Sequence, residues 1–362
     1  MKKLLWSLLI LAVFVIPCHA ADISQEQAEA VGASSLTEEL PEEAAEVLSD
    51  VDLTGEIDFW GEFKLLLYQA LTGSDSALKS GMKLCAILLA VVTLCAIVKM
   101  ASHLDIGNAV SVVGALGICA VFAGSFQSML HLATDTLEQL TEYTGCLLPV
   151  LASAVAMSGG MASSTAMYTG TVIFSELLMQ LITKVLTPIV YFYLVVATAE
   201  AALASDMLSE IREFIGWLVS KSLRIILFVF TGYMSISGVI SGTSDAAAVK
   251  ATKAVSGMVP VVGGILSDAS DTLLASASTL KNCIGVFGML AILAICLTPF
   301  LQVGIQYLLL KGTAAISGTI GMKPHIRLLK NFSSAMGYLL AMNGTCALMM
   351  LISAVCFLKV VS

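Results

Sequence analysis

The sequence predicts an all-α polytopic membrane protein, a helix bundle with six full spans and a range of six to eight. Hydrophobic residues occupy 58% of the 362 positions and charged residues only 12%, whereas soluble domains carry about a quarter charged residues. The mean hydropathy of +0.93 reflects several apolar stretches long enough to cross a bilayer. This composition excludes a water-soluble enzyme. The sequence contains no catalytic, metal-binding or cofactor-binding motif, so we expect a protein that is not an enzyme and holds no cofactor.

Residues 1–20 are predicted to be a secretory signal peptide. Lys2 and Lys3 precede an apolar run that ends at Pro17, and the small residue Ala20 follows, which is the usual order of charged, apolar and cleavage regions. The apolar run is shorter than a spanning helix requires. Cleavage after Ala20 would place the mature N-terminus on the outer side of the membrane.

Residues 21–80 are predicted to form an acidic outer-side segment that ends in an interfacial helix. Positions 21–63 contain thirteen Asp or Glu residues and no Lys or Arg. A short helix is expected over Pro41–Leu48, because proline suits the first turn of a helix. A second, over Ile57–Leu71, is expected to lie on the outer leaflet, since aromatic side chains recur in it at helical spacing. The acidic charge favours either a docking surface for a basic partner or a solvated spacer.

Six apolar stretches account for the predicted spans, and the first two form a helical hairpin over 81–123. The stretches are 84–98, 106–122, 168–204, 222–240, 283–310 and 335–358. The third would form about 55 Å of helix against roughly 30 Å of hydrocarbon. It contains Leu-Thr-Pro at Pro188, and the fifth stretch contains the same tripeptide at Pro299. Each of these prolines is a predicted kink.

An offset of 111 residues relates these two tripeptides and also places Pro149 over Pro260, which Gly263 and Gly264 follow. We take this as a hypothesis of a parallel internal repeat, with membrane units 124–242 and 243–362. In it, the two Pro-Val segments are candidate re-entrant half-spans. The alternative is coincidence, because apolar sequence of low diversity produces short matches easily.

A count of basic residues does not decide the orientation, because eight fall on the predicted inner side and eight on the outer side or in the membrane. Two connectors favour the orientation that the signal peptide predicts. The connector 311–330 contains four Lys or Arg and no acid, whereas 124–145 contains three acids and no base. Basic loops favour the cytoplasmic side. We therefore expect a multi-pass protein of the cell membrane with its mature N-terminus outside.

Two groups of side chains are candidates for function. Glu176, Gln180 and Lys184 follow one another at i, i+4 and i+8 and form a polar stripe that either lines a pore or packs against neighbouring helices. The second group is the apolar face of an amphipathic stretch that is expected to lie on the inner leaflet as an elbow helix, either coupling to a cytoplasmic partner or anchoring passively. Its members are Met207, Leu208, Ile211, Phe214, Ile215 and Leu218.

The stretch Gly257-Met-Val-Pro-Val-Val-Gly-Gly-Ile-Leu-Ser-Asp268, in a glycine-rich polytopic body behind an acidic segment, resembles the stage III sporulation protein AE family. The resemblance carries no catalytic residue. It implies residence in the mother-cell membrane that engulfs the forespore. It also implies partners among the other stage III sporulation A-operon proteins, including an ATPase and ring-forming subunits, and in the forespore membrane.

The role that the resemblance implies is a permease-like or channel-forming subunit of a feeding-tube complex that forespore development needs. The lipid bilayer is an expected partner, further copies of the chain would form a homo-oligomer, and no nucleic-acid partner is expected. Two alternatives stay open: a scaffold that assembles the complex without transporting anything, and an independent secondary transporter.

Overall fold

The computed structural model describes residues 27–48, 57–101, 107–204, 207–256 and 262–359. Within these ranges the chain is helical and contains no β-strand. The helices are α3 (Ser35–Glu38), α4 (Glu42–Leu48), α5 (Phe59–Gly73), α6 (Asp75–Ala101), α7 (Gly107–Met157), α8 (Met161–Leu181), the π-helical turn η1 (Ile182–Leu186), α9 (Thr187–Leu203), α10 (Ser209–Ser256), α11 (Val262–Ser317) and α12 (Lys323–Lys359). The predicted signal peptide and Pro260 lie outside the described residues.

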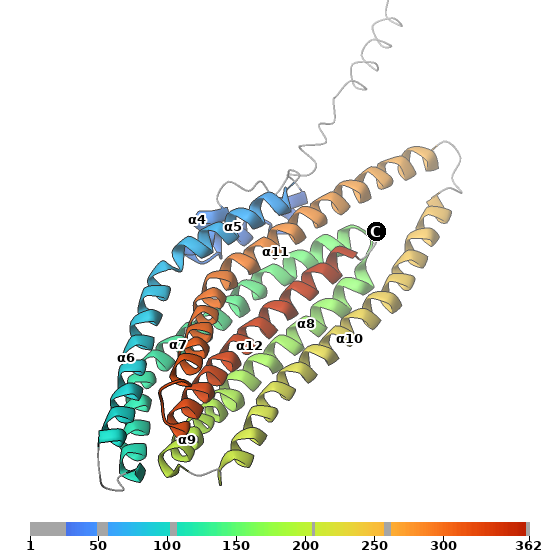
Figure 1. Ribbon diagram of the computed structural model, residues 1–362. Coiled ribbons are helices and arrows are strands. Elements are labelled where there is room, and N and C mark those ends of the chain that lie inside the picture. Colours follow the sequence, from blue (N-terminus) through green and yellow to red (C-terminus); the bar gives the residue numbers. More distant parts are fainter. Residues whose placement is uncertain (1–26, 49–56, 102–106, 205–206, 257–261, 360–362) are drawn as a thin grey trace, which may run out of the picture.

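Six helical segments are long and apolar enough to cross a membrane, as predicted. They are α5–α6, α7, α8–α9, α10, α11 and α12, and successive segments run in opposite directions along the bundle (Figure 1). Helices α4 and α5 lie at one end. The C-terminal ends of α6, α9 and α11 and the N-terminal ends of α7, α10 and α12 lie at the other end, which we call the loop end.

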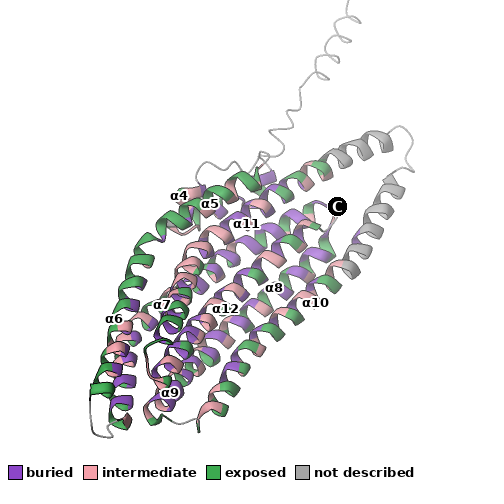
Figure 2. Cartoon of the chain, viewed as in Figure 1, coloured by how far each residue is buried: buried purple, intermediate pink, exposed green. Residues whose placement is uncertain are grey.

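Helices α7, α11 and α12 form the centre of the bundle and make the most extensive contacts with one another. Their inward faces are buried along much of their length (Figure 2). Phe122 of α7 stacks on Phe332 of α12 with the ring centroids 4.0 Å apart. Both aromatic rings are buried, so this contact joins two of the three central helices through apolar burial.

The short helices of the acidic segment pack on this core. Both predicted helices are present, as α4 and α5, and both contact α11. Helix α5 buries Leu66 and Ala70 and exposes Trp60 and Tyr68. An amphipathic helix with exposed aromatic side chains at one end of a bundle suits the headgroup region of a bilayer.

The re-entrant half-span predicted at Pro149 is replaced by a continuation of helix α7. The predicted connector 124–145 and the segment that follows it are one continuous helix of 51 residues, so the structure shows no re-entrant turn there. Pro149 is exposed while Leu148 and Val150 are buried, and the packing of these neighbours offsets the one backbone hydrogen bond that proline removes.

The chain turns only after Met157. The amide of Gly160 donates to the carbonyl of Val155, and that of Gly159 donates to the carbonyl of Ala156. Gly159 has a φ of +95°. This is a Schellman helix end, in which the left-handed position favours glycine. The next helix starts at once, and its first amides, those of Ala162 and Ser163, donate to the carboxylate of Asp245 on α10 at 2.9 Å each.

The two units of the proposed repeat do not form separate domains, and the helix directions are compatible with a repeat. Segment α8–α9 and helix α11 run in the same direction, as do α10 and α12 (Figure 1), which a parallel repeat requires. The unit boundaries 123/124 and 242/243 fall inside α7 and α10. Gly263 and Gly264 lie in the first turn of α11. The internal repeat therefore stays a prediction.

Candidate functional site

A buried ionic cluster joins α9, α10 and α12 near the loop end. Glu200 of α9 is 1% exposed. Its carboxylate accepts a hydrogen bond from Nε of Arg212 at 2.8 Å and another from Nη1 of Arg327 at 3.1 Å. One carboxylate thus pairs with two guanidinium groups from different helices. Such charge-assisted bonds fix geometry, and removing one partner of a buried pair leaves an uncompensated charge.

Neutral polar contacts surround this ionic cluster. The hydroxyl of Tyr193 donates to Oδ1 of Asn331 at 3.5 Å, and the ring of Tyr193 meets that of Tyr338 edge to face. On the other side of α12, Nε2 of the buried His325 lies 3.3 Å from the carbonyl oxygen of Ser111 on α7. The loop end of the bundle is therefore held by polar contacts as well as by apolar packing.

Sequence reasoning did not single out this ionic cluster. Its local signal was Glu200, an acidic residue near the end of the overlong third span, together with Arg212 in the predicted amphipathic stretch and Arg327 in the basic connector 311–330. Arg212 lies 12 positions from Glu200 and Arg327 lies 127 positions away. Only the packing of α12 against α9 brings the second arginine to the carboxylate.

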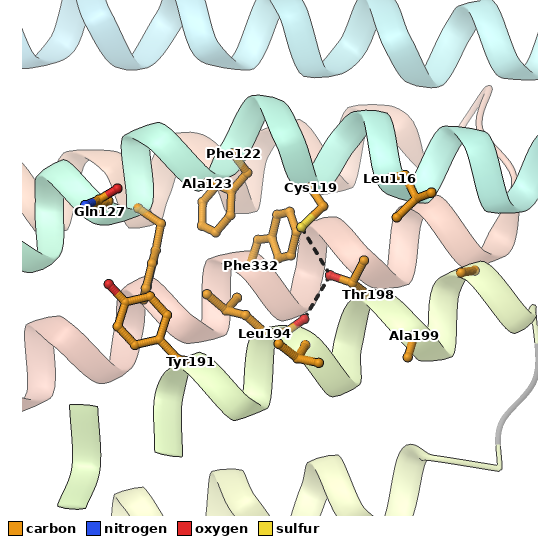
Figure 3. Close-up of a pocket in the computed structure, with 13 residues that line it drawn as sticks. Leu116, Cys119, Phe122, Ala123, Gln127, Tyr191, Leu194, Thr198, Ala199 and Phe332 are labelled. Carbon is orange, nitrogen blue, oxygen red and sulfur yellow. Dashed lines mark hydrogen bonds between the residues drawn. The ribbon is translucent and has the colours of Figure 1, made fainter. Parts of the chain in front are cut away.

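An apolar cavity of about 470 Å³ lies between α7 and α9, with Phe332 of α12 in its wall (Figure 3). Thr198 is one of its few polar groups, and the hydroxyl of Thr198 already donates to the carbonyl of Leu194 at 2.8 Å. The described residues contain no group of three His, Cys, Asp or Glu side chains that could hold a metal. The cavity walls suit hydrocarbon rather than an ion.

The predicted stripe is intact but faces out of the subunit. Glu176, Gln180 and Lys184 are all exposed, and the amide nitrogen of Gln180 donates to Oε1 of Glu176 at 2.6 Å. No described carboxylate pairs with the ammonium group of Lys184. Apolar side chains such as Ile173 and Val185 share the exposed face. These three residues therefore do not line a pore inside a single copy of the chain.

The two predicted kinks behave differently. The π-helical turn η1 includes Lys184 and ends one residue before Thr187-Pro188, so the α-helical hydrogen-bond pattern changes just before Pro188. The kink itself stays a prediction. Pro299 lies inside α11, which stays continuous. Single π-helical turns occur often at functional positions, and here the turn coincides with the last residue of the polar stripe.

The predicted elbow helix is not a separate element. Ser209–Ser256 is one helix, so the amphipathic stretch forms the first turns of a span instead of lying on its own along the inner leaflet. Ile215 is buried, Leu208 and Leu218 are half-buried, and the remaining three side chains of the predicted face are exposed. Those three are Met207, Ile211 and Phe214. No glycine or proline lies between Leu218 at the end of this stretch and Ser222 at the start of the predicted span. The helix therefore continues from one into the other.

Comparison with known proteins gives a family match over most of the chain. The stage III sporulation protein AE family matches residues 51–360. The chain belongs to this family. A curated relative of that name in Bacillus subtilis (strain 168) is 25% identical over 234 residues, which cover 63% of this chain and 58% of the relative. The match thus spans less than two thirds of the relative's length. No solved structure matches the chain.

Proposed function

We propose that this family member is a membrane subunit of a sporulation complex in the mother-cell membrane around the forespore, and that it contributes to the conduit of that complex without catalysing a reaction. Its mature N-terminus and helices α4 and α5 would face the intermembrane space. Its partners would be the ATPase and ring-forming subunits of the same operon, and a forespore membrane protein. Family membership and the six spanning segments support this proposal.

The observation that carries the proposal is the outward-facing polar stripe on α8 and η1. Lys184 lies near the middle of the span Met161–Leu203. A Lys, Arg or Asp at the centre of a spanning helix costs about 2.5–3.5 kcal/mol on insertion scales. Glu176 and Lys184 therefore need cover from protein or water rather than lipid. A water-filled conduit that this chain forms together with neighbouring subunits of the complex supplies that cover.

Single substitutions test this role in sporulating cells. Glu176→Ala and Lys184→Ala are each examined for co-isolation of the complex and for spore formation, with Ile173→Ala as the control on the same exposed face. We expect normal assembly with a loss of spores. A loss of assembly would instead favour the scaffold function. Unchanged assembly together with unchanged spore counts would overturn any role of the stripe.

A further inference from the structure

Three cavities adjoin one another along one face of α11. The first, of about 450 Å³, lies between α4, α7 and α11. The second, of about 450 Å³, lies between α4, α5 and α11, and the third, of about 360 Å³, lies between α6, α7 and α11. Ala294 lines both the first and the second cavity, and Gln302 lines both the second and the third. The shared wall residues place the three cavities next to one another, in a row that runs from beneath α4 toward the space between α6, α7 and α11.

The lining changes from acidic to neutral polar along this row. Glu42 and Asp135 line the first cavity and Glu46 lines the second. The third is lined by four hydroxyls and two amides. These are Ser76, Ser80, Ser125, Ser128, Gln302 and Gln306. None of the described residues that line the three cavities is basic. Carboxylates at the outer end attract cations and repel anions.

Gln306 shows that the polar lining continues below the surface of the bundle. It is 4% exposed, and its amide nitrogen donates to the hydroxyl oxygen of Ser125 on α7 at 3.1 Å. Buried amides and hydroxyls can exchange such bonds with a polar solute, whereas an apolar wall cannot.

Pro299 adds a backbone acceptor beside the first cavity. Both Pro299 and Ile295 line this cavity. Because proline has no amide hydrogen, the carbonyl of Ile295 cannot receive the usual helical bond from residue 299. The helix nevertheless stays continuous there. The proline thus places an additional oxygen acceptor in the wall on the acidic side of the row.

The row is closed toward the loop end by apolar side chains. Leu84 lines the third cavity, and one helical turn further along each of the three helices stand Leu88 of α6, Phe122 of α7 and Leu310 of α11. All three are at most 1% exposed. The polar space is therefore open beneath α4 and α5 and blind at its inner end.

We propose that this row of cavities is an access vestibule for small polar solutes that are cationic or uncharged, and that it discriminates against anions. As a step in transport the vestibule rests on the proposed conduit function, but its access and charge preference are properties of this chain alone. Helix α4 borders the opening, the carboxylates select by charge, and the amides and hydroxyls of the third cavity bind the solute.

Cysteine labelling tests the vestibule in the full chain, in membrane vesicles and with the native cysteines replaced. Ser125→Cys and Gln302→Cys are treated with a cationic and an anionic methanethiosulfonate of similar size from the side on which α5 lies. The control is Leu308→Cys, because Leu308 of α11 is 64% exposed but lies outside the row. We expect both vestibule cysteines to react, the cationic reagent reacting roughly tenfold faster, and the control to stay unlabelled in lipid.

Removing the carboxylates provides the second measurement. In Glu42→Gln, Glu46→Gln and Asp135→Asn combined, the preference for the cationic reagent should fall toward one while both cysteines stay reactive. Unreactive cysteines at 125 and 302 in a chain of normal membrane abundance, or equal rates for both reagents before the carboxylates are removed, would overturn the proposal. These rates do not depend on sporulation, so failure of the conduit function alone would leave them unchanged.

Discussion

The segment α8–α9 and the helix α11 contain the same Leu-Thr-Pro tripeptide and respond to it differently. The chain forms a π-helical turn directly before Thr187-Pro188, whereas α11 continues through Pro299 as one helix. The most apolar window of the first segment is 33% buried and that of the second is 56% buried. Helix α11 is held by α4, α5, α6, α7 and α12, whereas α8–α9 has one free face. The surroundings, rather than the tripeptide, decide how the proline is accommodated.

The two segments also direct their polar groups differently. The peripheral segment α8–α9 has ionisable groups on two faces. The stripe of Glu176, Gln180 and Lys184 faces away from the bundle, whereas Glu200 faces into it. The central helix α11 has uncharged Gln302 and Gln306 beside a half-open cavity between α6, α7 and α11. A peripheral helix can offer charge to a neighbouring subunit, whereas a central helix must satisfy its polar groups within the bundle.

Removing Glu200 should have the largest effect, because Glu200 links α9 to both α10 and α12. Glu200→Ala takes this carboxylate from Arg212 and Arg327, whose side chains are 15% and 32% exposed. Because water still reaches both guanidinium groups, we expect the free energy of unfolding to fall by about 3 kcal/mol, the low end of the range for buried pairs. Thermal unfolding in detergent measures this effect. Glu213→Ala is the control, because the Glu213 side chain is 66% exposed and, among the described residues, its ion pair is with Arg212. Equal losses in the two variants would contradict a structural role of the buried cluster.

Enlarging a glycine on the central helix tests how tightly that helix is held. A Cβ atom on Gly288 would lie 2.7 Å from a methyl carbon of Leu147, whereas one on Gly312 would meet nothing within 4 Å. We expect Gly288→Val to destabilise the protein by about 1–3 kcal/mol more than Gly312→Val. Both variants carry the same intrinsic change in helix propensity, so the difference between their unfolding temperatures reports packing. No difference would mean that α7 and α11 separate easily.

Replacing the two prolines should have the smallest effect and sharpens the comparison directly. Pro299→Ala supplies an amide to the carbonyl of Ile295 inside a continuous helix, and we expect stability to rise by about 1 kcal/mol. Pro188 lies in the first turn of α9, where an amide is not needed, so Pro188→Ala should change stability less. The unfolding temperatures of the two variants measure these gains. A larger gain from Pro188→Ala would show that Pro188, and not Pro299, costs the helix a backbone hydrogen bond.

Local pattern alone determined much of this protein. Apolar length predicted six spans, proline at a helix start predicted α4, and aromatic spacing predicted α5. These features depend on neighbours within a few turns along the chain, and such neighbours are visible in sequence. The stripe at Glu176, Gln180 and Lys184 was also visible, but the direction in which it faces was not.

The tertiary structure decided what distant segments do to one another. It kept α7 helical through Pro149, because Leu148 and Val150 pack into the core while the proline ring stays outside. It also brought Arg327 to Glu200 across 127 positions and aligned three cavities along α11. Hydropathy sums over adjacent residues, whereas burial, ion pairing and cavity lining depend on which helices meet, so only the packed bundle could reveal them.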